Sequence, residues 1–479
     1  MIFNSFTFLV FFLVVTPLYY LTPYRWRWLL LLLASCFFYA WFIPAYLLIL
    51  FAIIGIDYIA GRCIAGAAGN KRRGFLIMSL VANLGVLATF KYHNFFVDNV
   101  NSLLETLHIH TTPFPLWHLI LPLGLSFHTF QAMSYTLEVY KGNLAPERHL
   151  GIYALYVMFY PQLVAGPIER PGQLLHQFYE KHDPDYPGIA DGLKKMLWGF
   201  FMKVVVADRL GLYVDYVYTY PHTHSRLALL IAIVFFAFQI YCDFAGYSLI
   251  AIGSAKTMGF TLAENFNLPF IATSVIDFWR RWHMSLYRWF NDYLYMPIVI
   301  EKRHWGRWAV VYGIFVTFFL SGLWHGAAWA FVIWGLLHAL AMSIEFLVNP
   351  KIMSAKRKTT RPVIAAARWL VTFTFLCFTW IFFRAGDLHK ALAVVGRVIN
   401  PHTHWAYPTE FSEHFILLSG VAGTVTVALA DIVTGFYSKK LLPLHHPRPT
   451  IRLAACTTLI IVILLFGVLD SSQFIYFQF

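Results

Sequence analysis

Charged residues are scarce in this sequence: Asp, Glu, Lys and Arg together make up 12% of its 479 residues. A soluble domain carries about 25%, so roughly half of the usual charge is missing. Hydrophobic residues make up 59% and gather in long runs, such as 10–20, 28–42, 228–240 and 459–469. These runs approach the length of about 20 residues with which a helix crosses a bilayer. No single soluble core buries all of them, so the sequence predicts an all-α integral membrane protein.

Nucleotide-binding motifs are also absent. The sequence has neither a G-x-x-x-x-G-K-[ST] loop nor a G-x-G-x-x-G turn, which argues against an ATP-driven pump or a dinucleotide enzyme. The five cysteines show no paired spacing, so we predict neither a disulfide framework nor a zinc site. Two imidazoles two residues apart can share a metal, but no acid or cysteine is spaced to complete such a site, and we predict no metal. The pairs concerned are His108/His110, His222/His224 and His402/His404.

The net charge of the chain is +13. In a membrane protein such an excess usually reflects the positive-inside rule, by which Lys and Arg gather in cytoplasmic loops. No basic patch on a soluble surface is indicated, so we predict no nucleic-acid partner. Placing each basic cluster inside gives about twelve crossings with both termini outside, and leaves 152–165 as a re-entrant or interfacial segment. The N-terminal run is expected to be the first crossing rather than a cleaved signal peptide.

Polar residues at membrane depth are costly and usually mark function. The segment SGLWHG at 321–326 stands between two apolar runs, and its two glycines permit a broken backbone. Irregular backbone at this depth is tolerated only inside protein or beside water, so we expect His325 to face an internal cavity. Imidazole is the usual general base near neutral pH. The alternative is a structural histidine that caps a helix hairpin.

A second polar segment covers residues 277–295 and fits an amphipathic helix, with aromatic residues at i, i+3 and i+4. On this pattern alone it is equally well an interfacial helix. His283 lies on the aromatic edge, one turn from Trp279, and this position predicts that it is carried inward beside His325. His338 follows His325 by thirteen residues, or about 20 Å of helix. It is therefore not expected to act on the same atom, and helix packing is an equal alternative for it.

Weaker groups of polar residues in apolar runs suggest a polar cavity inside an aromatic-rich bundle, although helix packing explains each of them alone. Basic groups at the inner mouth are expected to attract the phosphates of an anionic substrate, although the same charges also serve topology. The residues expected to line a tunnel or contact substrate are Trp324, Ser321, Gln131, Ser126, Asp243, Asp277, Arg280, Arg281 and His338.

Taken together, DFWRRWHMSL at 277–286 and SGLWHG at 321–326 resemble the membrane-bound O-acyltransferases. More narrowly, they resemble the bacterial branch of the alginate O-acetylation membrane protein, which also includes peptidoglycan O-acetylation and teichoic-acid D-alanylation proteins. FQAMSY at 130–135, PQLVAGPI at 161–168, QIYCDFAGY at 239–247 and WIFFRA at 380–385 agree with the same family. The resemblance covers nearly the whole chain, and we expect one polytopic domain over 1–479 with its motif core at about 117–350.

This resemblance implies a ring of about 11–12 spans, with re-entrant or interfacial helices, around a thin centre with a funnel. It places His325 at the bottom of the funnel as a catalytic residue, with His283 as the second one. It also implies an O-acetyltransferase of the bacterial inner membrane, in contact with membrane lipid, that uses acetyl-CoA or another acyl thioester as donor and binds no cofactor. A periplasmic acetyltransferase is the implied protein partner.

The implied acceptor is an exported polysaccharide such as alginate, while peptidoglycan, cellulose and teichoic acid remain open. The alternative from another class is a transporter or channel that moves acyl groups without chemistry of its own, because broken helices and intramembrane polar groups are also transporter features. The two halves of the chain show no inverted repeat, which favours the enzyme.

Overall fold

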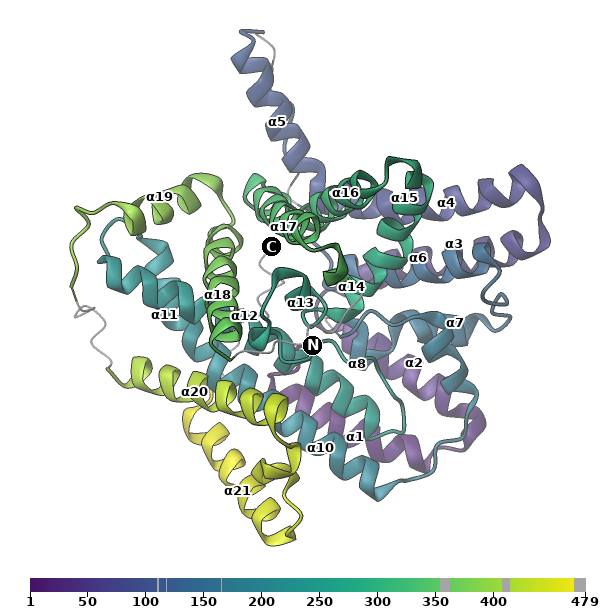
Figure 1. Cartoon of the computed structure of the whole chain (residues 1–479). Helices are drawn as coiled ribbons and strands as arrows, with labels where there is room; N and C mark the ends of the chain where they lie inside the picture. The colour runs from purple at the N-terminus through teal and green to yellow at the C-terminus, as the bar shows by residue number, and fades with distance from the viewer. Residues whose placement is uncertain (110–111, 118, 165, 354–361, 407–413, 469–479) are drawn as a thin grey trace. The chain divides into compact units, whose positions relative to one another are not determined.

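The computed structural model describes residues 1–109, 112–117, 119–164, 166–353, 362–406 and 414–468 (Figure 1). All regular structure in these residues is helical, as the apolar runs predicted. The chain forms two compact units, one of residues 1–193 with 251–263 and the other of residues 194–250 with 264–479. This division does not test the predicted single domain, which stays a prediction.

The first unit contains the N-terminal helices. Two long helices belong partly to it, because the chain passes to the second unit within α10 and returns within α12. Its elements are α1 (Phe6–Leu21), α2 (Tyr24–Ala40), α3 (Tyr46–Gly66), α4 (Gly69–Leu87), η1 (Ala88–Tyr92), α5 (His93–Thr106), α6 (Leu125–Lys141), α7 (Leu150–Met158), α8 (Tyr160–Leu163), α9 (Pro171–Leu174) and η2 (Leu175–Tyr179), with the start of α10 (Tyr186–Phe200) and the end of α12 (Arg226–Lys256).

A buried polar cluster joins three helices of the first unit. Asp57 on α3 is fully buried, and its carboxylate accepts hydrogen bonds from Ser79 Oγ at 2.6 Å and from Asn83 Nδ2 at 2.9 and 3.0 Å. Ser79 Oγ also lies 3.0 Å from Thr136 Oγ1 on α6. Because a buried polar group is costly unless it is hydrogen-bonded, this cluster fixes the register of α3, α4 and α6.

The second unit contains most of the aromatic-rich motifs of the sequence. Its further elements are η3 (Phe201–Ala207), α11 (Asp208–Thr219), η4 (Pro269–Ile271), α13 (Val275–Trp279), α14 (Met284–Phe290), η5 (Asn291–Tyr295), α15 (Met296–Glu301), η6 (Arg303–Trp305), α16 (Arg307–His325), α17 (Trp329–Val348), η7 (Pro350–Met353), α18 (Pro362–Ala385), α19 (Leu388–Ile399), α20 (His414–Phe436), η8 (Lys439–Leu441), η9 (Pro443–His445) and α21 (Pro449–Phe466).

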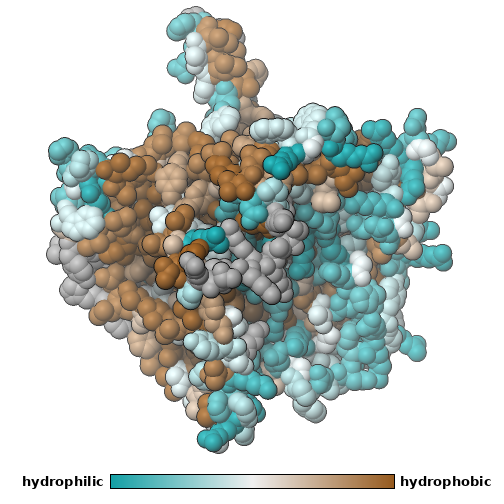
Figure 2. All heavy atoms as spheres, in the orientation of Figure 1, coloured by the Kyte–Doolittle hydropathy of each residue, from teal (hydrophilic) through white to brown (hydrophobic). Residues whose placement is uncertain are grey.

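Eight helices of the described residues are long and apolar enough to cross a membrane, and they make this a multi-pass membrane protein. Other predicted crossings fall on shorter helices: α1 has 16 residues, and α2 and α6 have 17 each. A helix of 17 residues is about 26 Å long, somewhat less than a hydrocarbon core of about 30 Å. The total of about twelve crossings therefore stays a prediction. Figure 2 shows apolar side chains exposed over the region of α16 to α18, as a lipid-facing surface requires.

Helices α16 and α17 form a tight hairpin through glycine contacts. A Cβ at Gly322 would lie 2.4 Å from the carbonyl oxygen of Phe331, and a Cβ at Gly335 would lie 2.2 Å from that of Phe318. Only glycine allows two backbones to approach so closely. The three-residue link 326–328 then turns the chain, so the predicted break lies just after His325, and Gly322 continues the helix.

Candidate active site

His325 is the last residue of α16 and is enclosed by aromatic rings. Its side chain is 4% exposed, and its ring centroid lies 4.9 Å from those of Trp324 and Trp334 and 5.2 Å from that of Phe383. The glycine-packed hairpin brings Trp334 to it, while α18 supplies Phe383. The imidazole is thus held by three elements inside protein, as its place between two apolar runs predicted.

The predicted continuous helix over 277–295 is wrong, because the chain breaks at His283. Helix α13 ends at Trp279 and α14 begins at Met284. Between them His283 adopts a left-handed conformation with φ 44° and ψ 51°. The tryptophan and phenylalanine side chains on both sides of the break are nevertheless buried. A spacing of three and four residues indicates which side chains are buried. A helix interrupted by one left-handed residue buries much the same set of side chains, so the spacing does not reveal the break.

The break turns His283 into the protein, where it is 1% exposed. Its ring centroid lies 4.6 Å from that of Phe244 on α12 and 6.1 Å from that of Trp324. Trp324 therefore contacts both predicted catalytic histidines, His283 and His325. Burial lowers the pKa of His283 to about 3, so its imidazole is neutral at pH 7.

His338 on α17 supports α13. It is fully buried, and Trp279 Nε1 donates a hydrogen bond to its Nδ1 at 3.2 Å. Two turns further along α17, the carboxylate of Glu345 accepts from the backbone N–H groups of Val275 and Ile276 at 2.8 and 3.0 Å. A buried tryptophan N–H usually finds a hydrogen-bond acceptor, and the acceptor of the Trp279 N–H is His338 Nδ1. This hydrogen bond gives His338 a packing contact, one of the two alternatives that the sequence left open, and its predicted place in a tunnel lining stays a prediction.

The charged groups of the Arg-Trp-His segment are engaged within the protein. Arg281 Nε lies 3.0 Å from Asp277 Oδ1, and both side chains are about one third exposed. Arg280 Nη2 donates to the backbone oxygen of Ile352 at 3.1 Å. Their predicted attraction of an anionic donor stays a prediction.

Asp243 belongs to a buried ion cluster rather than standing alone. Lys203 Nζ lies 2.7 Å from Asp243 Oδ1 and 2.6 Å from Asp208 Oδ1, and all three side chains are at most 4% exposed. Lys203 is part of η3, a π-helical stretch between α10 and α11, while Asp243 lies on α12. Such stretches often occur at functional positions. Sequence reasoning missed Lys203 because nothing in its local pattern indicates that the distant Asp243 faces it together with the nearby Asp208.

Two predicted residues, Ser126 and Gln131, belong to the first unit. Both are buried on α6. Gln131 Nε2 donates to the backbone oxygen of Tyr156 at 2.5 Å, and Gln162 Nε2 donates to the same oxygen at 2.9 Å. Gln131 therefore binds the end of α7, just before the chain breaks between α7 and α8.

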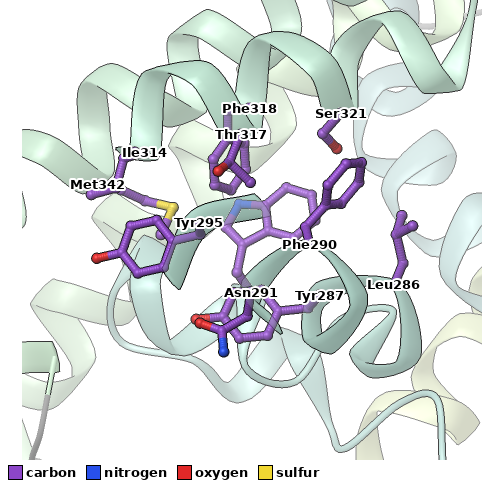
Figure 3. Close-up of a pocket in the computed structure, with 11 residues that line it drawn as sticks. Leu286, Tyr287, Phe290, Asn291, Tyr295, Ile314, Thr317, Phe318, Ser321 and Met342 are labelled. Atoms are coloured by element: carbon purple, nitrogen blue, oxygen red, sulfur yellow. The ribbon is translucent and has the colours of Figure 1, made fainter. Parts of the chain in front are cut away.

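A mostly apolar pocket lies in the second unit between α14, η5, α16 and α17 (Figure 3). The space between its walls that no atom fills is about 520 Å³, and this volume includes open solvent. Ser321 and Thr317 project from α16 toward the aromatic rings of α14. Thr317, Ser321 and His325 are spaced by four residues, so they share one face of α16. The pocket thus follows this face up to the turn before His325.

One residue of the pocket lining, Thr317, has a buried hydroxyl whose Oγ1 makes no hydrogen bond within the described residues. An unsatisfied buried hydroxyl is costly and requires an explanation. Sequence reasoning named Ser321 but missed Thr317, although its position eight residues before His325, two steps of four along the same helix face, was a signal that could have found it.

Two histidines of the His-x-His pairs have separate local contacts. His224 packs against Tyr216, with ring centroids 4.8 Å apart, and His404 accepts a backbone hydrogen bond from Arg226. His110 lies outside the described residues. No group of three His, Cys, Asp or Glu residues is placed to hold a metal ion in the part of the chain that the structure describes.

Comparison with known proteins agrees with this arrangement. Residues 149–383 match the model of the MBOAT, or membrane-bound O-acyltransferase, family. The chain is 38% identical over 396 residues to the probable alginate O-acetylase AlgI of Pseudomonas aeruginosa, covering 82% of this chain and 73% of that protein. It is 36% identical over 398 residues to the peptidoglycan O-acetyltransferase of Helicobacter pylori, covering 77% and 73%.

A more distant relative is the teichoic acid D-alanyltransferase of Bacillus subtilis, 32% identical over 289 residues, which cover 57% of this chain and 71% of the relative. The family match spans α7 to α18 and includes both predicted catalytic histidines, His283 and His325. The named relatives share acyl transfer but differ in the polymer they modify. The chain therefore belongs to the membrane-bound O-acyltransferase family and is a multi-pass membrane O-acyltransferase.

Proposed function

We propose that this protein transfers acetyl groups from a cytosolic thioester, such as acetyl-CoA, for the O-acetylation of an exported polysaccharide such as alginate. The observation that carries the proposal is the pair of buried histidines, His283 and His325, that share contact with Trp324. The names of the two most similar relatives given above, an alginate O-acetylase and a peptidoglycan O-acetyltransferase, support acetyl as the transferred group. Because the donor is cytosolic and the polymer lies outside, the protein acts in the bacterial inner membrane.

In the proposed reaction, His325 is the general base. It takes the proton of an acceptor hydroxyl while the hydroxyl oxygen attacks the thioester carbonyl. The carbon–sulfur bond then breaks, and the departing thiolate receives the proton from His325. His283 orients the reacting groups through its neutral imidazole. The hydroxyl belongs to the polysaccharide, or to a periplasmic acetyltransferase that passes the acetyl group on.

We further propose that the pocket along α16 holds the chain of the acyl donor. It ends one turn before His325, and its wall is apolar apart from a few polar groups that include Thr317, Ser321 and Asn291. The arm of a coenzyme A thioester is a flexible chain with amide groups, which suits an apolar wall with isolated hydroxyls. Thr317 Oγ1 is a buried hydroxyl of this wall without a partner in the described residues, and we propose that it binds such an amide. The lining roles of Ser321 and Trp324 belong to this proposal, and those of Ser126 and Gln131 stay predictions.

Thr317→Val tests the pocket, because valine keeps the shape of threonine and removes only the hydroxyl. We expect the KM for the acetyl donor to rise about 5- to 10-fold, the loss of one hydrogen bond of ~1–1.5 kcal/mol. The unfolding temperature is not expected to fall, since Oγ1 has no protein partner to lose. The matched control is Ser343→Ala on α17, where another buried hydroxyl without a partner lies outside the pocket lining. An unchanged KM in Thr317→Val would reject donor binding at this pocket.

The competing function is an acyl-group transporter without chemistry of its own. Purified protein in liposomes, given acetyl donor with radiolabel in the acetyl group, distinguishes the two. Our proposal predicts donor cleavage with label transferred to an added polysaccharide, its oligomer or the periplasmic partner. A transporter instead moves the label across the bilayer with the thioester intact. Comparing acetylation of alginate, cellulose, peptidoglycan and teichoic acid in cells with and without the protein then identifies the acceptor.

A further inference from the structure

Asn265, in the loop between α12 and α13, contacts the turn that carries His283. It is 1% exposed. Its side-chain oxygen Oδ1 lies 3.1 Å from His283 Nδ1, 2.9 Å from Ser285 Oγ and 3.3 Å from the backbone nitrogen of Ser285. Its amide nitrogen Nδ2 donates to Ser248 Oγ on α12 at 3.2 Å. One buried side chain therefore connects α12, the His283 turn and the start of α14.

These contacts determine which nitrogen of His283 carries the proton. The backbone nitrogen of Ser285 can only donate, so the Asn265 atom that faces it must be the oxygen. An oxygen only accepts, so His283 Nδ1 must donate to it and must carry the ring proton. In the neutral imidazole, Nε2 then holds the lone pair. The backbone N–H of Ser285 thus fixes both the orientation of the Asn265 amide and the tautomer of His283.

Asn265 also holds the backbone on which His283 stands. The left-handed conformation of His283 costs about 1–2 kcal/mol relative to the right-handed one, so surrounding contacts must impose it. The backbone N–H of Met284 donates to the backbone oxygen of Asn265 at 2.9 Å, directly after the strained residue. Asn267 N donates to Arg281 O at 2.9 Å on the other side. Main-chain bonds from this loop therefore hold the turn on both sides of His283.

We propose that Asn265 is a positioning residue that fixes the tautomer and direction of the His283 imidazole for acyl transfer. This inference rests on the proposed function, because it requires His283 to take part in the reaction. Asn265 itself acts through His283 and does not need to touch substrate. Outer partners that orient a functional histidine typically contribute about 10- to 100-fold.

The test compares Asn265→Leu, His283→Ala and the double variant for acetyl transfer from labelled acetyl donor. Asn265→Leu keeps the side-chain size and removes the acceptor. We expect it to lower kcat by about 10- to 100-fold, with little change in the KM for the donor. In the His283→Ala background the same substitution should change the residual rate less than about 3-fold, because its target is gone. Ser285→Ala is the matched control: it removes a bond to the same Oδ1 and leaves that of His283, so kcat should stay within about 3-fold of the unchanged protein.

Three outcomes distinguish a failure of the positioning role of Asn265 from a failure of the proposed function on which that role rests. Full activity of His283→Ala would reject the role of His283 in the proposed function. A large loss in His283→Ala with full kcat in Asn265→Leu would reject only the positioning role. Equal losses of kcat in Asn265→Leu and Ser285→Ala, accompanied by equal falls in unfolding temperature, would show that Asn265 merely supports the fold. The last comparison does not depend on residual activity in His283→Ala.

Discussion

Replacing His325 with alanine is expected to lower acetyl transfer by about 10²- to 10⁴-fold, the usual contribution of a positioned general base. The imidazole is held by Trp324, Trp334 and Phe383, so water that enters the vacated space cannot reproduce a base at a fixed position. The measurement is the rate of acetyl transfer by the purified protein, together with polysaccharide acetylation in cells. The variant should remain folded. Its unfolding temperature in detergent, compared with that of the unchanged protein, checks this.

The matched control for this substitution is His304→Ala. His304 is exposed in η6, in the same unit, where its ring lies against Trp305. Removing this imidazole should leave the rate unchanged, because nothing in its surroundings fixes it against a substrate. If His325→Ala folds and transfers acetyl groups as fast as the unchanged protein, His325 is not the base.

Lys203→Met is expected to cause the largest loss of stability, about 3–5 kcal/mol in the free energy of unfolding. The substitution keeps the length of the side chain but removes the ammonium group that lies within 2.7 Å of both Asp208 and Asp243. Two buried carboxylates then face each other without this cation. Their neutralisation through Asp208→Asn and Asp243→Asn, added to Lys203→Met, should restore part of the loss. Unfolding in mixed micelles of denaturing detergent measures the difference.

Lys195→Met provides the control for burial. Lys195 Nζ lies 2.8 Å from Glu264 Oε1, a distance close to those of the buried cluster, but its side chain is 26% exposed and that of Glu264 is 54% exposed. Removing this cation should cost only about 0–1 kcal/mol, because water solvates the remaining carboxylate. A cost for Lys203→Met no larger than that for Lys195→Met would contradict a stabilising role for the buried cluster.

The sequence indicated the class of fold because membrane insertion depends mainly on the composition of local runs. Eight long apolar helices confirm the predicted multi-pass helical protein. Sequence alone also singled out His325, because an ionisable group between two apolar runs is conspicuous wherever the helices pack. The family resemblance, carried by ordered motifs over the whole chain, added acyl transfer and the second histidine, and the comparisons confirm the family.

Other parts of the candidate site depend on residues far apart in the chain. Lys203 lies 40 residues before Asp243, and Asn265 lies 18 residues before His283; no local period connects either pair. The predicted helix over 277–295 was wrong for a related reason. Burial of aromatic side chains follows the same spacing in a continuous helix and in one broken by a single left-handed residue, and the break is imposed by hydrogen bonds from the distant loop that contains Asn265.

By itself, the sequence determined that this protein is a membrane-embedded helical bundle and that His325 is a buried histidine of functional interest, because hydrophobic runs and a polar interruption are local properties of the chain. Only the tertiary structure decided that a left-handed break at His283 carries it inward, that Trp324 contacts both histidines and that Asn265 Oδ1 accepts a hydrogen bond from His283 Nδ1. Direction and hydrogen-bond partners arise where separate segments meet, and the order of residues within one segment does not specify them.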